Sequence, residues 1–577
     1  KFTPIPGDVS KPFGGLPDDL RDSIRGNIHC LVNIAGVVDF NPPLDDALNV
    51  NAFGMQSLVS LAKDLGDVPF LHTSTCYVAG DRTGQIDELH PTEFPFPKAE
   101  ELGVQHWSAD GEVAECVDLV ENVRHRANDA FRRSHFLDKA RSNLKKRGEP
   151  ARGTALQDEL DKVHRRYESD RLIAAGLERA KFWGWHNVYT YTKSIGEQVL
   201  CASGLPFTIA RPAVIESSVS FPFPGWNEGI NTSAPLIYMG MQGLLSYPAH
   251  RDAVLDVIPV DLVSSGMIMT LAELLEGTHK VVYQYGTSDS NPFFVYRFIE
   301  LVSLYKRRHF REKGKGNPLM NWLQMHYGPT PISPETYFKW GPSRLADTAL
   351  AASKVIGDVG SEVLALKPLL DPSSRILEGF GKTNQKTAFI LDQFVPFMAT
   401  HNYRFSAANT RAAYARLNDE DREKLCWNPE DVDWRKWVME VHIPGIQRHV
   451  VPLIEEKMER PKKPLRPYDD LVSFLDEIAE RFEHAPCLMR VESEGISRLT
   501  FLEVRERARA CAQRLNEMGV EEGDRIILSG LNHPDWVINW FGIVLAGAVV
   551  VPVEPGLTEE QAANIAATAS VRAAVLD

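Results

Sequence analysis

Two short apolar runs, IHCLVNI at residues 28–34 and FLHT at residues 70–73, flank a segment, 44–65, whose apolar side chains recur at helical spacing. Alternation of strand, helix and strand is typical of parallel sheets that are covered by helices. A further strand-like run, FTIA, occupies residues 207–210. These stretches together predict an α/β fold that is built on a parallel sheet.

The composition is that of a globular protein. The chain has 577 residues, of which 44% are hydrophobic and 24% are charged, and these fractions exclude wholesale disorder and fibrous repeats. A chain of this length predicts about three to five domains. Its 63 Lys and Arg against 77 Asp and Glu give a net charge of −14, which argues against nucleic acid as a partner.

The cysteine pattern and the absence of a leader predict a cytoplasmic protein. None of the seven cysteines forms a C-x-x-C pair, and Cys30 and Cys76 lie in apolar runs where a buried thiol is expected. The sequence therefore predicts a reducing compartment without structural zinc, and no metal-binding residue is expected. No signal peptide precedes Lys1, and Asp577 follows an apolar run, so we expect both ends to be cut through folded domains.

One apolar stretch, 537–553, imitates a short membrane span, but Gly547 divides it, and we expect a buried helix followed by a strand. The basic run at 145–147 leaves a peripheral membrane contact open, although interleaved charges of both signs favour a solvated helical face. The oligomeric state is left open.

The strongest chemical motif is Tyr189-Thr-Tyr-Thr-Lys193. Tyr189 and Lys193 are four residues apart and would share one face of a helix. A lysine ammonium beside a phenol is expected to lower the phenol pKa, and such a tyrosine can protonate a carbonyl oxygen. The motif alone is weak, since it occurs by chance in many proteins.

Other motifs strengthen it. The sequence HTST ends at Thr75, whose hydroxyl could bind the same carbonyl, and Ala35 and Gly36 are small residues at the end of a predicted strand. Asp8 follows a short apolar run and is expected at a strand's carboxyl edge, where ligands bind in parallel sheets. Each feature has a purely structural explanation, but their joint occurrence in this order favours a reductase site.

The chain resembles the extended short-chain dehydrogenase/reductases, and within them the fatty acyl-CoA reductases that make alcohols. The collinear motifs that carry the resemblance, over about residues 1–460, include HTSTCYVAG, NVYTYTKSIGE, PFPGWNEG, DVIPVDLV and the C-terminal HNYRFSAANTRAAYARL. The resemblance implies a Rossmann-like sheet, NADPH as cofactor and a long-chain acyl-CoA as substrate. The thioester would be reduced to an aldehyde and then to a primary alcohol.

Residue roles are also implied by the resemblance. Tyr189 would be the proton donor, Lys193 its partner and a ligand of the nicotinamide ribose, and Thr75 the third catalytic residue. The cofactor would further be contacted by Asp8 and Val9 at the adenine, by Ala35, Gly36 and Ser74 along its path, and by Pro212 under the nicotinamide.

Two features depart from the family pattern. Thr75 and Tyr189 are 114 positions apart (189 − 75), and the charged segment 98–186 fills the gap; bacterial fatty acyl-CoA reductases are similar in having a helical insert there. No G-x-x-G-x-x-G loop lies upstream, so we expect the chain to begin near the third strand and to lack the first strands of the sheet. Gly14 and Gly15 indicate a turn, and the residues do not decide between NADPH and NADH.

The end of the chain resembles a second family, the adenylate-forming acyl-CoA synthetases. The motifs GVEEGDR at 519–525, NHPDW at 532–536 and LAGAVVVP at 545–552 match the family's N-terminal subdomain. The resemblance implies ATP and Mg²⁺ as ligands of a part of that domain that lies beyond residue 577. A fusion would raise the local concentration of the acyl-CoA that the reductase consumes.

The predicted organisation therefore has five parts. They are a truncated NAD(P)-binding region (1–97), a charged helical insert (98–186), the rest of the reductase and its substrate region (187–300), a helical C-terminal domain (301–462) and a partial adenylation subdomain (463–577).

Three other interpretations stay open. A thioester reductase could act on a carrier-bound acyl chain, but no carrier-type Gly-Asp-Ser motif lies between the parts. A non-catalytic module could only bind acyl-CoA, which the retained Thr75, Tyr189 and Lys193 argue against. A sugar-nucleotide epimerase shares the three residues but leaves the helical region and the synthetase start unexplained.

Overall fold

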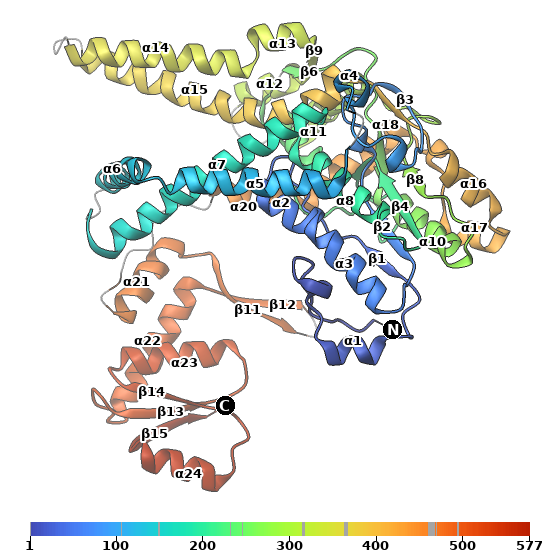
Figure 1. The fold of residues 1–577 in the computed structure, drawn as a ribbon. Helices are drawn as coiled ribbons and strands as arrows, with labels where there is room; N and C mark the ends of the chain where they lie inside the picture. The colour runs from blue at the N-terminus through green and yellow to red at the C-terminus, as the bar shows by residue number, and fades with distance from the viewer. Residues whose placement is uncertain are drawn as a thin grey trace. The chain divides into compact units, whose positions relative to one another are not determined.

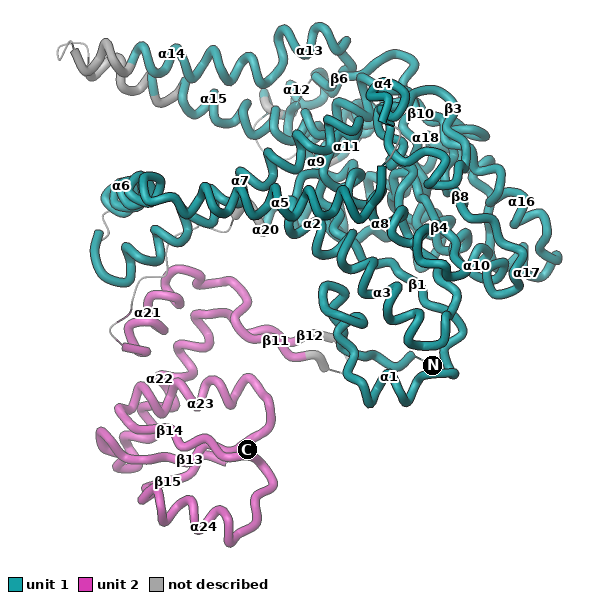
Figure 2. Tube along the Cα trace, viewed as in Figure 1, with its two compact units in different colours: residues 1–460 teal, residues 461–577 magenta. Residues whose placement is uncertain are grey.

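The computed structural model describes residues 2–104, 107–147, 151–230, 232–244, 246–313, 318–362, 367–459, 468, 470–492 and 495–576. The chain forms two compact units, which comprise residues 1–460 and 461–577 (Figure 2). The boundary between the units lies within two residues of the predicted division between residues 462 and 463. Helix α20 (Val451–Glu459) ends just before it, and 460–467 lie outside the described residues.

The first unit is built on a four-stranded parallel sheet, as the sequence predicts. Its strands are β1 (Leu31–Asn33), β2 (Phe70–Thr73), β4 (Phe207–Pro212) and β8 (Val282–Tyr285), in the order β1-β2-β4-β8. The register aligns His72 with Asn33 on one side and with Ile209 on the other. Helices cover the sheet (Figure 1), and the strand side chains are largely buried, as is typical of parallel sheets.

The start of the chain differs from the expectation. Residues 2–30 contain no strand, and Asp8 follows an exposed, irregular segment in which Phe2 and Ile5 point into solvent. No described strand lies beside β1 on that side, so the segment has no backbone to pair with. The thiol of Cys30 is correspondingly only half-buried, whereas Cys76 is buried as predicted, and all seven cysteines are free.

The predicted helix at 44–65 is two helices, α2 (Leu44–Asn51) and α3 (Phe53–Asp64), which meet at Ala52. Helix α8 (Val188–Cys201) packs against both. At the junction Gly196 lies so close that a Cβ atom there would be 2.5 Å from the Asn51 carbonyl oxygen. A glycine is therefore needed for α8 to lie this close to the end of α2.

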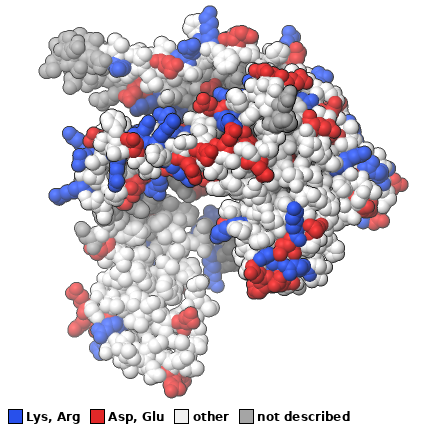
Figure 3. Space-filling view, viewed as in Figure 1, with Lys and Arg blue, Asp and Glu red and all other residues white. Residues whose placement is uncertain are grey.

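The segment between Thr75 and Tyr189 is helical. It forms α4 (Ala99–Leu102), α5 (Ala109–Ala127), α6 (Ala130–Arg147) and α7 (Gly153–Trp183). Its apolar residues recur every three or four positions, which predicts one buried helix face; they are Val113, Cys116, Val120, Val123, Ala127 and Phe131. Val113, Cys116, Val120 and Ala127 are buried, and Val123 is half-buried. Phe131 is 82% exposed, because α5 ends at Ala127 and Phe131 belongs to the next helix. Acidic and basic side chains lie side by side over these helices (Figure 3), as expected for a solvated face.

A buried carboxylate joins this helical segment to α8. Glu112 on α5 accepts two hydrogen bonds from Arg179, at 2.7 and 2.6 Å, and one from the Trp183 indole at 2.8 Å. The Tyr191 phenol on α8 donates to the same carboxylate. The helical segment thus holds α8 through one fully hydrogen-bonded acid.

The C-terminal part of the first unit is mostly helical and is interwoven with the sheet region. Strand β10 (Tyr403–Phe405) pairs in parallel with β3 (Gly84–Ile86), and Arg411 forms a bidentate ion pair with Asp289 at 2.9 and 2.7 Å. Two long helices, α14 (Pro342–Glu362) and α15 (Lys367–Val395), extend side by side as a hairpin (Figure 1).

Its remaining elements are η1 (Pro12–Gly15), α1 (Asp18–Ile24), η2 (Cys76–Ala79), η3 (Pro91–Glu93), β5 (Val214–Glu216), α9 (Ala234–Gln242), β6 (Ser246–Pro248), β7 (Val257–Pro259), α10 (Val260–Glu276), α11 (Val295–Lys313), α12 (Pro318–His326), β9 (Thr330–Ile332), α13 (Pro334–Trp340), η4 (Pro396–Thr400), α16 (Ala408–Arg416), α17 (Asp419–Leu425), η5 (Pro429–Asp431), α18 (Trp434–Lys436), η6 (Trp437–His442) and α19 (Ile443–His449). The turn that Gly14 and Gly15 predict is present at η1, where both have positive φ.

The second unit has a parallel sheet of its own, in the order β14-β13-β15. The predicted helix–strand division at Gly547 is confirmed, since α23 precedes it and β14 follows. No helix in the described part of the chain is long and apolar enough to cross a membrane. The elements of the unit are α21 (Leu471–Phe482), β11 (Pro486–Glu492), β12 (Gly495–Thr500), α22 (Phe501–Glu517), β13 (Arg525–Ser529), α23 (Pro534–Leu545), β14 (Val549–Val553), α24 (Glu559–Thr568) and β15 (Val571–Leu576).

Replacing Glu112 by alanine tests the attachment of the helical segment. The change leaves Arg179, Trp183 and Tyr191 without their shared acceptor, so the free energy of unfolding should fall by about 3 kcal/mol in urea titrations followed by tryptophan fluorescence. The matched control is Glu115→Ala, which removes an exposed carboxylate from the same arginine and should cost less than about 1 kcal/mol. Equal losses in the two variants would contradict the role of Glu112.

Candidate functional site

The candidate site lies at the carboxyl ends of three neighbouring strands, the edge at which ligands bind in parallel sheets. Ala35 and Gly36 follow β1, Ser74 and Thr75 follow β2, and Pro212 ends β4. The Asn33 side chain accepts a hydrogen bond from the Ala35 N–H at 3.0 Å, which fixes the turn after β1. Five predicted site residues therefore share one edge of the sheet.

Helix α8 brings the tyrosine and the lysine to this edge. Asn187 caps the helix by accepting a hydrogen bond from the Thr190 N–H at 2.8 Å, and Tyr189 and Lys193 follow one turn apart. The Lys193 ammonium donates to the Thr73 carbonyl oxygen at 3.0 Å. A Cβ atom at Gly36 would lie 2.7 Å from Lys193 Nζ, so a larger residue there would displace the ammonium from its present position at the end of β1.

Thr75 is the link between the tyrosine and the strand ends. Its buried hydroxyl donates to the Pro212 carbonyl oxygen at 3.4 Å and accepts from the Tyr77 N–H at 3.3 Å, and it lies close enough to the Tyr189 phenol to affect the phenol's pKa. Thr75, Tyr189 and Pro212 thus lie around one point, and Lys193 reaches the same edge through Thr73.

The electrostatics of the tyrosine differ from the expectation. Burial raises the pKa of the Tyr189 phenol to about 12, and the nearby Thr75 hydroxyl opposes this only in part. The expected lowering of the pKa by Lys193 is therefore wrong for the protein alone, because loss of hydration dominates. The phenol carries its proton at neutral pH, which is the state that a proton donor needs.

The pKa of Lys193 is shifted in the opposite direction, downward. Burial lowers the pKa of its ammonium to about 8, while the Glu197 carboxylate, one helical turn further on, opposes the shift. Glu197 in turn forms a bidentate ion pair with Arg211, at 2.9 and 2.6 Å. The lysine is charged at pH 7 but lies close to its titration point.

Several buried polar atoms at this edge have no hydrogen-bond partner in the described part of the chain. They are the hydroxyl oxygens of Thr73 and Ser74, His72 Nε2 and Asn51 Oδ1. Unpartnered buried polar atoms are costly, and where they cluster a polar ligand can satisfy them. Together with the close glycine at position 36, these atoms fit the ribose and amide groups of a nicotinamide nucleotide.

Asp8 and Val9 lie apart from this cluster. The Asp8 carboxylate is exposed and accepts hydrogen bonds from Ser10, at 3.0 Å from the N–H and 2.6 Å from the hydroxyl, which lower its pKa. Val9 packs close to Gly54 on α3, where a Cβ atom would lie 3.5 Å from Val9 Cγ2. An open depression of about 590 Å³, lined in part by Ser10 and Val37, lies next to these residues. This depression would lengthen the candidate site along the carboxyl ends of the strands.

Two residues of the site were not predicted from the sequence. Asn51 donates to the Thr192 hydroxyl at 2.9 Å and places its carboxamide oxygen near Gly36. Glu197 carries the ion pair with Arg211 and acts on Lys193. The spacing of Tyr189, Lys193 and Glu197, each four residues from the next, could have indicated Glu197 as part of the same helix face.

Two family models match parts of the chain. An NAD-binding family model described as Male sterility protein matches residues 1–267, and one described as AMP-binding enzyme matches residues 475–577. Among solved structures, the terminal R domain from the myxalamid PKS-NRPS pathway aligns over 74% of this chain and 74% of its own, with a TM-score of 0.35 and 15% identity.

Curated relatives match the first four fifths of the chain. Fatty acyl-CoA reductase 2, chloroplastic, of Arabidopsis thaliana is 25% identical over 460 residues, which cover 78% of this chain and 66% of that protein. Fatty acyl-CoA reductase 8 of the same plant is 26% identical over 465 residues, covering 78% and 82%. The alcohol-forming fatty acyl-CoA reductase of Simmondsia chinensis is 25% identical over 468 residues, covering the same two shares. The resemblance that the motifs predict is confirmed: residues 1–267 match the Male sterility protein model, residues 475–577 match the AMP-binding enzyme model, and most of the chain is homologous to fatty acyl-CoA reductases.

Proposed function

We propose that the first unit reduces a long-chain fatty acyl-CoA with NADPH, through an aldehyde to a primary alcohol. The observation that supports this proposal best is the close approach of Thr75 and Tyr189 at the sheet edge that Lys193 also reaches. A phenol, a hydroxyl and an ammonium at one point suit a substrate whose carbonyl oxygen gains negative charge during reduction.

The cofactor would be held along the strand ends. Lys193 and the hydroxyl of Ser74 would bind the nicotinamide half, Ala35 and Gly36 would allow the cofactor to approach the backbone, and Pro212 would lie against the ring. Asp8 and Val9, next to the open depression, would contact the adenine half. Bound NADPH would supply a hydride to the carbonyl carbon; the preference for NADPH over NADH rests on the resemblance alone.

Tyr189 would donate its proton to the carbonyl oxygen of the thioester. Its pKa of about 12 keeps the phenol protonated in the resting site, and a donor so placed becomes effective only when the carbonyl oxygen gains charge. Thr75, already close to the phenol, would stabilise the same oxygen. The resulting hemithioacetal would lose CoA as the thiol, its hydroxyl proton passing to the departing sulfur, and leave the aldehyde carbonyl in the same position. Tyr189, reprotonated from solvent, would then give that oxygen a second proton as a second NADPH supplies the second hydride.

Lys193 would support the tyrosine electrostatically. Its ammonium, fixed by the Thr73 carbonyl, would favour the phenolate that remains after proton transfer. Glu197 and Arg211 would keep the lysine in place and set its charge. The role of the lysine would thus be to stabilise the negative charge that develops on the Tyr189 oxygen.

The second unit would belong to an adenylate-forming ligase that activates a fatty acid with ATP and Mg²⁺. We assign no adenylation residue within 475–577. Its acyl-CoA product is the substrate proposed for the first unit, so covalent linkage would raise the local concentration of that product.

Replacing Tyr189 by phenylalanine tests the proton donor. The variant removes only the phenolic oxygen, so alcohol formation from palmitoyl-CoA in the natural protein should fall by about 10²- to 10⁴-fold, while NADPH affinity should change little. Gas chromatography of the alcohol and fluorescence titration of NADPH measure the two quantities.

Tyr191→Phe is the matched control for this variant. Tyr191 lies two residues further along α8 and donates to Glu112, so the control should lower stability without abolishing turnover. Unchanged turnover in Tyr189→Phe, or equal loss in both variants, would refute the role of Tyr189.

The pH dependence tests Lys193. Its pKa of about 8 means that the ammonium is present below about pH 8 and is lost above it, so kcat/KM for acyl-CoA should fall as the pH rises through about 8. Tyr189 stays protonated through this range because its pKa is about 12. In Lys193→Arg the charge persists, and the residual rate should not fall between about pH 7 and about pH 10. The same alkaline fall in both proteins would exclude Lys193 as its cause.

A further inference from the structure

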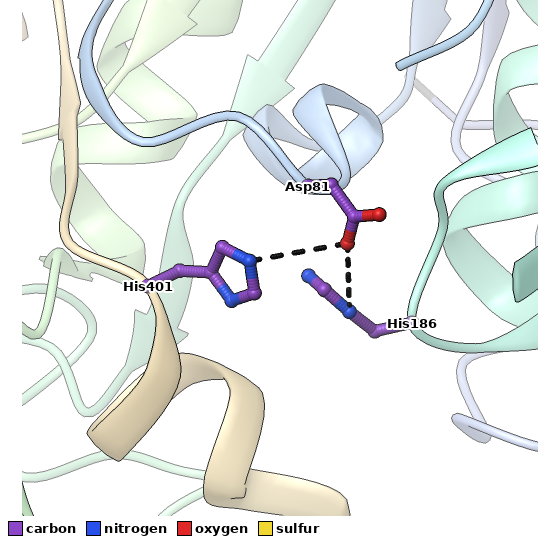
Figure 4. Close-up of side chains that lie close together, drawn as sticks. All are labelled: Asp81, His186 and His401. Carbon is purple, nitrogen blue, oxygen red and sulfur yellow. Dashed lines mark ion pairs between the residues drawn. The ribbon is translucent and has the colours of Figure 1, made fainter. Parts of the chain in front are cut away.

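Three potential metal ligands meet outside the proposed reductase site. Asp81, His186 and His401 come from three distant segments of the chain, and each directs a donor atom toward the others (Figure 4). Asp81 Oδ1 lies 3.4 Å from His186 Nδ1 and 3.9 Å from His401 Nε2. The two imidazole rings stack at a tilt, with centroids 4.4 Å apart.

The hydrogen bonds of the His186 ring orient it toward Asp81. The Tyr403 phenol donates its single proton to the Gly80 carbonyl oxygen at 2.7 Å, so its 3.2 Å contact with His186 Nε2 requires an N–H on that nitrogen. The other ring nitrogen, Nδ1, faces the Asp81 carboxylate.

The His401 ring is oriented in the same way. Its Nδ1 lies 3.3 Å from the Pro396 carbonyl oxygen, which can only accept, so Nδ1 carries a proton. The other ring nitrogen, Nε2, faces Asp81 Oδ1, and the donor atoms of the three side chains all lie within 4.8 Å of one another. A single cation at their centre would be within reach of all three.

We propose that Asp81, His186 and His401 form a binding site for one divalent transition-metal ion of the zinc type. Two imidazole nitrogens and a carboxylate oxygen are a ligand set that zinc accepts, with a fourth position left for water. Metal–ligand bonds of about 2.0–2.2 Å place tetrahedral ligand atoms about 3.3 Å apart. The distances of 3.4 and 3.9 Å need only small side-chain shifts to reach that geometry.

The surroundings match those of metal ligands. A ligating histidine commonly donates its other N–H to an oxygen, as His186 does to Tyr403 and His401 does to Pro396. Lys98 lies 4.0 Å from the other Asp81 oxygen, Oδ2, and also pairs with Glu101, so it does not compete for the Oδ1 that faces the histidines. The side chains of His186 and His401 are 15% and 17% exposed, which gives an ion a path from solvent.

The ion would join three parts of the first unit. Asp81 follows η2, the turn that begins after Thr75; His186 lies three residues before Tyr189; and His401 follows η4 in the C-terminal helical part. A bound metal would therefore fix the start of α8 against the segment that carries Thr75. The site is inferred from these ligands alone and does not depend on the proposed reductase activity.

Cobalt(II) is a spectroscopic probe for this site. The protein, stripped with EDTA and kept reduced, should bind one equivalent of Co²⁺ with visible absorption typical of a tetrahedral nitrogen–oxygen site, and Zn²⁺ should displace it. Thermal melting should shift upward on Zn²⁺ addition, because an ion that binds only the folded state stabilises it. Intense sulfur-to-cobalt bands instead would place the ion at cysteines and overturn the proposal.

Variants separate these ligands from other histidines. Asp81→Asn and His401→Ala should abolish both the cobalt absorption and the zinc-induced melting shift. Tyr403→Phe, which keeps the ring but removes the oxygen behind His186, should weaken binding by about 10-fold. His135→Ala removes an exposed histidine on α6 and should change nothing. Absence of saturable binding in the unaltered protein, or equal binding in His401→Ala and His135→Ala with folding verified by circular dichroism, would overturn the site.

Discussion

The burial of helix α8 is the constraint on which the first unit depends. From Val188 to Leu200 all but one of its residues are buried, although many are polar, so each polar group needs a partner from another element. Four different elements supply those partners. Asn51 on α2 bonds to Thr192, and Glu112 on α5 bonds to Tyr191. The Thr73 carbonyl on β2 bonds to Lys193, and Arg211 on β4 pairs with Glu197. The helix can therefore occupy only one position against the sheet.

That constraint explains how the proposed site tolerates a long insertion. Thr75 and Tyr189 are separated by four helices, yet their side chains meet, because α5 and α7 are held to α8 by the Glu112 carboxylate and do not cross the sheet edge. The inserted helices pack beside α8. They do not separate the strand ends that carry the proposed site residues. The same acid that attaches them also helps to fix the helix that carries the tyrosine and lysine.

The C-terminal helical part is coupled to the same framework. Strand β10 pairs with β3, and the Tyr403 phenol donates a hydrogen bond to the Gly80 carbonyl oxygen. The His401 ring contacts the ring of His186, which lies three residues before Tyr189. Contacts between segments more than 200 residues apart in the sequence thus converge on the start of α8. Because packed protein interiors transmit displacement, a shift in one of these segments should displace the others.

The sequence alone determined the parallel strand–helix alternation, the helix that carries Tyr189 and Lys193, and the division at Gly547, because these features follow from local periodicity and from glycine. It failed at the start of the chain, where an apolar run has no strand to pair with, and at Phe131, where helical spacing continued past the end of a helix. Only the tertiary structure decided that Thr75 meets Tyr189, that burial raises the phenol pKa, and that Asn51, Glu112 and Glu197 serve the same helix. The physical reason is that hydrogen-bond partners and loss of hydration depend on which distant segments pack together, and residue spacing carries no record of that.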